Sequence, residues 1–208
     1  MSDRYAEMDE VLVYIQRHLD EPLTVSRLAA HVAYSPFHFI RIFKERTGLS
    51  PQYYVSSLRL ERAKSLLLRT NMSVRDVGLE IGQQSLGTFT TRFTERVGMT
   101  PSEFRNSAHQ TELHLQSLRR LSDWRERGPI ACPLSVVEGI IEAERPFEGV
   151  ILLGLFAKPI PEGMPLYGTL LSGLGPFQLT GIQPGVYYLM ATSVEWGTNA
   201  HDVLLPLA

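Results

Sequence analysis

Apolar residues in the first hundred positions recur every three or four residues, the spacing of one face of an α-helix. Met8, Val11 and Ile15 belong to the first such stretch. A serine or threonine precedes each of the next stretches and predicts a helix start there, because its hydroxyl caps the free N–H groups of the first turn. In three cases a proline follows directly, and proline fits the first turn of a helix. The predicted starts are Thr24, Ser35, Ser50, Ser73, Ser85 and Thr100. The first half of the chain is therefore expected to be all helical.

This helical pattern occurs twice, about 50 residues apart. The matching pairs are Phe43 and Phe93, Gly48 and Gly98, and Pro51 and Pro101. Each copy contains a short helix, a turn, a second helix, a glycine C-cap and a Ser/Thr-Pro restart. The two units cover residues 25–44 and 74–94, and the second has one extra residue in its turn. Phe39 and Phe43 in the first copy, and Phe89 and Phe93 in the second, are four residues apart on one helix face. We expect these four rings in the core.

Paired short helices of this kind match the geometry of a helix-turn-helix. Its first helix crosses the DNA backbone and its second enters the major groove. The predicted helix between the two units is about 19 residues long and spans about 28 Å at about 1.5 Å per residue. Successive major-groove faces lie roughly 34 Å apart. One chain is therefore expected to place two recognition helices in successive grooves without dimerising.

The region 4–106 resembles the DNA-binding domain of the AraC/XylS family of bacterial regulators. The resemblance is strongest over residues 93–105, FTERVGMTPSEFR, which are similar to the family's F-x-x-x-x-G-x-[ST]-P-x-x-[FY]-R ending, and residues 43–51 echo it. It implies promoter binding, usually as an activator, with RNA polymerase as the partner of an activator. One position departs from the family: Gln83 follows Gly82 where an aromatic residue is common, which predicts weaker packing of that turn.

The resemblance also implies which residues read DNA. In unit one they are Ser35, Phe37, His38, Ile40, Arg41 and Lys44. In unit two they are Ser85, Leu86, Gly87, Thr88 and Thr91, with Arg92 and Arg96 expected at the DNA backbone. Arg41 suits bidentate contact to guanine, Phe37 and Ile40 suit thymine methyl groups, and Lys44 suits a phosphate. Since unit two offers few bidentate donors, we expect unit one to discriminate bases and unit two to position the protein.

The pattern changes after residue 128, where short β-branched and aromatic runs alternate with glycine and proline. The predicted strands are Ser135–Ile141, Gly149–Phe156, Leu166–Leu171, Phe177–Ile182, Gly185–Val194 and Val203–Leu207. The fold class is therefore an all-α double helix-turn-helix domain (residues 4–106), a polar linker helix (107–128) and a small all-β antiparallel sandwich (129–208).

Residues 175–189 are similar to a segment of transthyretin-like, or carboxypeptidase-regulatory-like, β-sandwich domains. Alternation assigns Phe177, Leu179, Tyr187 and Leu189 to the core of such a domain. The dipeptide at 184–185, Pro-Gly, predicts a type II turn with positive φ at the glycine.

Composition and charge restrict the remaining possibilities. Of the 208 residues, 44% are hydrophobic, which is ordinary for a globular protein, and the formal net charge is −2. Residues 1–108 hold 14 Arg and Lys against 12 Asp and Glu, whereas the rest hold 6 against 10. This balance permits DNA binding without requiring it, because affinity depends on how cations cluster opposite phosphates.

No chemistry of an enzyme is expected. Cys132 is the single cysteine, so no intrachain disulfide is possible, and it lacks the adjacent His-Arg pattern of alkyl-accepting repair cysteines. The histidines have no metal-ligand spacing, and the serine at 172 is not part of a nucleophile elbow. We expect no metal, cofactor or catalytic site. Without a signal-peptide stretch or membrane span, a cytoplasmic protein with no membrane partner is expected.

The sequence thus favours a sequence-specific DNA-binding regulator of transcription. The alternative is a small-molecule- or carbohydrate-binding or interaction protein whose helical half serves assembly. For residues 129–208 two roles are open: a sensor of a small-molecule effector, or an interaction module that forms a homodimer.

Overall fold

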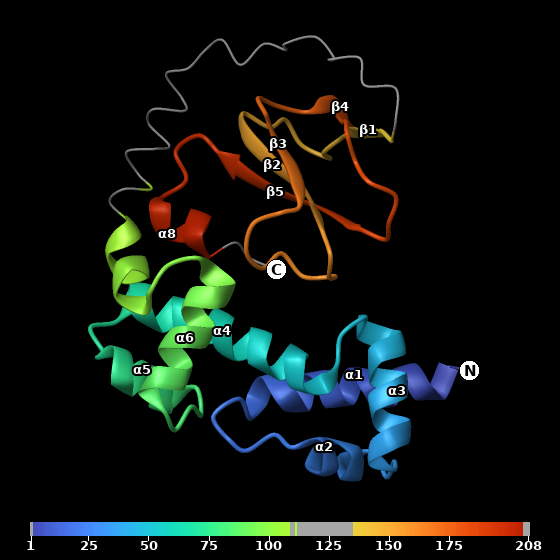
Figure 1. Ribbon diagram of the computed structural model, residues 1–208, viewed down its shortest axis with the longest axis vertical. Coiled ribbons are helices and arrows are strands. Elements are labelled where there is room, and N and C mark those ends of the chain that lie inside the picture. The colour runs from blue at the N-terminus through green and yellow to red at the C-terminus, as the bar shows by residue number, and fades with distance from the viewer. Residues whose placement is uncertain (1, 109–110, 112–134, 206–208) are drawn as a thin grey trace. The chain divides into compact units, whose positions relative to one another are not determined.

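The structure is a computed structural model that describes residues 2–108, 111 and 135–205 (Figure 1). The chain divides into two compact units, Met1–Arg105 and Asn106–Ala208. Most of the predicted linker helix, and Cys132, lie outside the described residues. Within the described part, no helix combines the length and apolar character that crossing a bilayer requires.

The first unit is all helical, as predicted. Its helices are α1 (Ser2–Arg17), α2 (Val25–His31), α3 (Pro36–Thr47), α4 (Pro51–Arg69), α5 (Val74–Glu80) and α6 (Leu86–Val97). Residues 101–108 are also helical. Five of these helices begin where the sequence predicts, since each capping hydroxyl accepts a hydrogen bond from the backbone N–H three residues later. The caps are Thr24, Ser35, Ser50, Ser73 and Ser85.

The predicted duplication is confirmed by the structure. Helices α2 and α5 have 7 residues each, and α3 and α6 have 12 each. The turn of unit one covers residues 32–35 and that of unit two residues 81–85, so unit two has the expected extra residue. Both second helices end at a left-handed glycine, Gly48 and Gly98. The two units are therefore copies of one structural element joined by α4.

The second helix of each unit inserts two aromatic rings into the core. Phe39 and Phe43 of α3 are fully buried, and Phe89 and Phe93 of α6 are 3% and 0% exposed. Their ring centroids lie 5.5 Å apart in unit one and 5.7 Å apart in unit two, within the range of favourable aromatic pairs. The predicted core positions are confirmed, and their burial leaves the opposite face of α3 and of α6 toward solvent.

The described residues of the second unit form five antiparallel strands in two sheets (Figure 1). They are β1 (Val137–Ile141), β2 (Gly149–Phe156), β3 (Tyr167–Leu171), β4 (Gly175–Leu179) and β5 (Tyr188–Glu195). One sheet has the order β1-β4 and the other β3-β2-β5. Side chains from both sheets join in one buried cluster, with Leu153 and Leu155 from β2 and Phe177 and Leu179 from β4. The predicted core positions Phe177 and Leu179 are confirmed, and Tyr187, also predicted in the core, is partly buried and packs against the same cluster.

The prediction of a strand at Val203–Leu207 is wrong for residues 203–205, and residues 206–207 lie outside the described residues. Residues Ala200–Leu204 form a short helix, α8. The side-chain oxygen of Asn199 accepts a hydrogen bond from the backbone N–H of Asp202 at 3.0 Å. This contact caps the first turn of a helix, and it outweighs the strand preference of the following apolar residues.

Two details of the predicted final hairpin are also wrong. Leu189 is 45% exposed, because β5 is an edge strand of its sheet. Gly185 does not adopt a positive φ, so the predicted type II turn is absent. A Cβ at Gly185 would instead lie 3.0 Å from the ring of Tyr187, whose hydroxyl donates to the carbonyl of Gln183 at 2.9 Å. The lack of a side chain at Gly185 therefore allows the ring of Tyr187 to approach the backbone closely.

Candidate nucleic-acid interface

The residues predicted to read DNA in unit one share the outer face of α3. Phe37 is 83% exposed and Ile40 is 38% exposed, while Arg41 and Lys44 are exposed beside them. Their spacing of three and four residues aligns them along one side of the helix. Ser35 caps the helix, so the free backbone N–H groups of its first turn point to the same end. This face combines apolar surface, two cations and a helix N-terminus.

Arg41 already has partners on its own helix. Its Nη1 lies 3.3 Å from the Oε1 of Glu45, and its Nη2 lies 3.4 Å from the Nδ1 of His38. The side chains of the Arg41–Glu45 pair are 53% and 57% exposed, so this is a surface ion pair of the i,i+4 kind. Such pairs contribute only about 0.3–0.5 kcal/mol. The guanidinium is therefore held along α3 but is easily released.

His38 differs from the other predicted readers because it is only half exposed. Its ring meets the ring of Tyr34 edge-on, with centroids 4.7 Å apart. Tyr34 belongs to the turn between α2 and α3. The imidazole therefore packs against the turn and also contacts Arg41, so it contributes to the shape of the outer face of α3.

The matching face of α6 is smaller and less charged. Leu86 is 47% exposed, and Gly87, Thr88, Thr91 and Arg92 are exposed with it. A Cβ built at Gly87 would meet only the Oγ of the capping Ser85, at 4.0 Å, so the N-terminal turn of α6 presents bare backbone. A surface of this kind is suited to close approach of a partner to the backbone and offers few side-chain donors.

Arg96 points toward α4 and not along the exposed face of α6 that carries Thr88 and Thr91. Its Nη1 donates to the hydroxyl of Ser56 at 2.7 Å and its Nη2 to the hydroxyl of Ser57 at 2.5 Å. Its guanidinium carbon lies 4.7 Å from the centroid of the Tyr53 ring, a cation–π distance. These contacts fasten α6 to the connecting helix. Sequence reasoning missed this role, because the partners lie about 40 residues earlier in the chain.

Gln83 lines a shallow hollow at the contact of α4 with unit two. The hollow has a volume of about 290 Å³, open to solvent, and its polar lining includes Arg59, Arg92 and Arg96. The backbone N–H of Gln83 donates to the carbonyl of Gly78 at 2.8 Å. The turn therefore keeps its backbone hydrogen bond, while Gln83 lines the open hollow.

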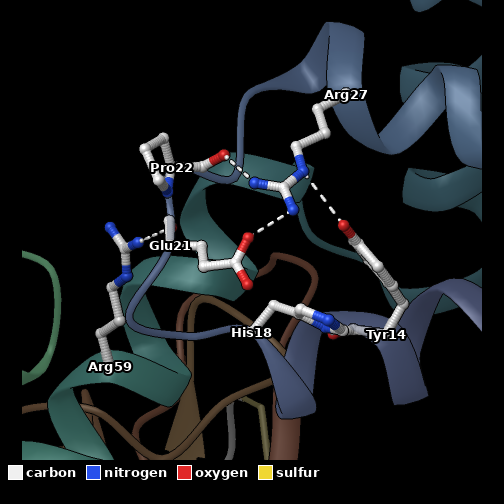
Figure 2. A network of polar contacts seen from close by, with 6 residues as sticks. All are labelled: Tyr14, His18, Glu21, Pro22, Arg27 and Arg59. Carbon is white, nitrogen blue, oxygen red and sulfur yellow. Dashed lines mark hydrogen bonds and ion pairs between the residues drawn. The ribbon is translucent and has the colours of Figure 1, made fainter.

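A polar network surrounds the loop between α1 and α2 (Figure 2). Arg27 of α2 donates through its Nε to the hydroxyl of Tyr14 at 3.0 Å and through its Nη1 to the carbonyl of Pro22 at 3.3 Å. Its Nη2 forms an ion pair with the carboxylate of Glu21. Arg59 of α4 reaches the same loop from the other side. Sequence reasoning did not single out either arginine.

The described geometry is that of a domain with two helix-turn-helix units. Residues 28–107 match the family model described as helix-turn-helix domain. Together with the relatives below, this match identifies the helical unit as an AraC-type helix-turn-helix DNA-binding domain, which confirms the resemblance seen in the sequence.

The chain is similar to the uncharacterized HTH-type transcriptional regulator YobQ of Bacillus subtilis, with 41% identity over 98 residues, which are 47% of this chain and 41% of the relative. It is also similar to the bifunctional transcriptional activator/DNA repair enzyme AdaA of the same organism, with 31% identity over 51% of each chain. Among solved structures, the DNA-binding domain of AdpA in complex with a target DNA matches with 28% identity over 50% of this chain and 93% of that chain, at a TM-score of 0.48. The chain spans two fifths to a half of the length of these curated relatives.

Proposed function

We propose that this protein is a sequence-specific DNA-binding regulator of transcription that inserts α3 and α6 into successive major grooves. The observation that carries the proposal is the pair of exposed faces on duplicated units, joined by the 19-residue helix α4. At about 1.5 Å per residue this helix is about 28 Å long, comparable with the roughly 34 Å of one DNA turn. The regulators among its relatives support the same reading.

The two helices have different tasks in this proposal. Helix α3 discriminates bases: Arg41 contacts guanine, while Phe37 and Ile40 contact thymine methyl groups. Lys44 neutralises a phosphate. Helix α6 positions the protein through its N-terminal backbone, Ser85, Thr88 and Thr91, with Arg92 at the DNA backbone. The contacts of Arg96 with α4 favour a supporting role for it over direct phosphate contact.

For the second unit we propose a small β-sandwich that modulates the first. The support is the single buried cluster to which both sheets contribute. The unit either binds a small-molecule effector or joins two copies of the chain, and residues 107–128 link it to the DNA-binding domain. We propose activation of transcription through RNA polymerase. The bifunctional transcriptional activator among the relatives supports activation over repression.

The test is selection of genomic fragments by the full-length protein, followed by gel shifts with the recovered fragments over a range of salt concentrations. A DNA-binding regulator yields a shared sequence and an affinity that falls as salt rises, because phosphate contacts release counterions. Arg41→Ala should relax the choice of base at one position, whereas the matched variant Arg62→Ala, at an exposed position of α4, should not. Absence of selective binding at low salt would refute the proposal.

A further inference from the structure

Arg59 connects the helix that joins the two units with the α1–α2 loop, which leads into unit one. Its Nε donates to the carbonyl of Leu19 at 2.8 Å and its Nη2 to the carbonyl of Glu21 at 2.7 Å. The side chain is about half buried, and this burial lowers the pKa of the guanidinium. A half-buried cation bound to two main-chain acceptors fixes both the distance and the angle between α4 and the loop.

The loop passes this constraint on to the reading helix of unit one. The carboxylate of Glu21 and the carbonyl of Pro22 both bind Arg27 at the start of α2, as Figure 2 shows. Helix α2 packs directly on α3. The contacts thus run from Arg59 through the loop and α2 to the helix that carries Arg41.

The same guanidinium touches the turn of unit two. Gly82 has a φ of +74°, and a Cβ built there would lie 3.0 Å from the Nη2 of Arg59 and 3.0 Å from the carbonyl oxygen of Asp20. A side chain at this position would push against both atoms. The turn that precedes α6 therefore lies against Arg59 and the α1–α2 loop together. One residue thus contacts both the turn of unit two and the loop that leads into unit one.

We propose that Arg59 is a positioning residue that fixes the orientation of α3 relative to α6 and thereby sets the length of DNA between the two half-sites that the protein accepts. This inference rests on the proposed function. One inserted base pair moves a half-site by about 3.4 Å along the DNA and rotates it by about 34°. A rigid pair of readers rejects that change, whereas a pair joined only through α4 tolerates it.

The experiment measures the dissociation constants of the full-length protein for a fragment selected by the wild type and for versions with one base pair inserted or deleted between the half-sites. The variants are Arg59→Met, Arg59→Lys and Gly82→Ala, and Arg62→Met serves as the matched control. Residues that couple two sites modulate that coupling by roughly 2- to 30-fold. We expect the spacer preference, the ratio of the dissociation constants for altered and optimal spacers, to fall by that factor in the three variants and to stay unchanged in the control.

If Arg59 has only a structural role, its substitution lowers the melting temperature of the protein but leaves the spacer preference at the wild-type value. That result would overturn the inference. If Arg59→Met does not fold, Gly82→Ala disturbs the same contact from unit two and decides the question. A wild-type protein that binds selected DNA but is indifferent to the spacer would refute the two-reader proposal itself. The two failures are therefore distinguishable.

Discussion

The ion pair on α3 makes a quantitative prediction about base recognition. Glu45 holds the guanidinium of Arg41 in the free protein, with 3.3 Å between the charged atoms. In the proposed contact with guanine, the guanidinium turns from Glu45 toward the base and this pair opens. Because an exposed i,i+4 pair is worth about 0.3–0.5 kcal/mol, Glu45→Gln should tighten binding about twofold. Removing the arginine itself should have a larger effect on binding. Arg41→Ala should cost about 1–3 kcal/mol of binding free energy, or roughly 5- to 150-fold in Kd.

A double-mutant cycle separates this coupling from simple repulsion between Glu45 and DNA phosphates. If Glu45 acts by holding Arg41, its substitution has no effect in the Arg41→Ala background. If it repels phosphates directly, the twofold gain persists there. The chain supplies a matched control: Glu95 is exposed at the equivalent place on α6, where the residue four positions earlier is Thr91. Glu95→Gln therefore reports the effect of removing an acid without releasing an arginine.

The assay is fluorescence anisotropy at fixed salt, with a selected fragment and with the same fragment carrying A·T in place of one G·C pair. Arg41→Ala should lose its preference between the two fragments. An equal loss on both would show that Arg41 binds only phosphate. A gain from Glu45→Gln that survives in the double variant would refute the coupling through the ion pair.

Three further predictions concern stability. Hydrogen bonds from the backbone N–H and the hydroxyl of Thr100 lower the pKa of Glu103, so its stabilising contribution is present above the ordinary carboxyl pKa and is lost as pH falls through the lowered value. Glu103→Gln should flatten that part of the melting temperature curve against pH, and an unaltered acid limb would contradict this. Phe93 is fully buried, so Phe93→Ala should cost about 3–5 kcal/mol in denaturant unfolding, and a cost under about 1 kcal/mol would show that the site collapses freely. In the second unit, Phe177→Ala should destabilise by a similar amount while Leu189→Ser stays within about 0.5 kcal/mol, and equal effects would contradict the edge position of Leu189.

The helix boundaries of the first unit were predictable because the forces that set them are local. The hydroxyl of Ser50 and the ring of Pro51 act within one turn of the helix that they begin. The left-handed C-cap at Gly48 is equally local. The buried phenylalanine pairs followed from helical periodicity, which depends only on having one face inward.

What the sequence did not reveal depends on contacts between distant segments. Arg59 and Arg62 are arginines on the same helix, yet only Arg59 contacts a loop 40 residues earlier. Arg96 was expected at the DNA backbone but contacts α4. The sequence near an arginine does not show whether its side chain points into solvent or toward a neighbouring helix. The exposure of Leu189 depends on sheet order, which alternation along one strand does not define.

The acceptors that Arg59 uses are main-chain carbonyls, and this has a consequence for how the protein can change over time. Side chains at positions 19 and 21 can be replaced without removing the atoms that the guanidinium binds, so the loop is free to vary as far as this contact is concerned. The restriction falls on Arg59 and on Gly82, where a side chain would be strained by the positive φ and crowded by Arg59 and the carbonyl of Asp20. In the proposed mode of binding, new DNA preferences can therefore arise on α3 and α6 while Arg59 and Gly82 preserve the frame that presents these helices.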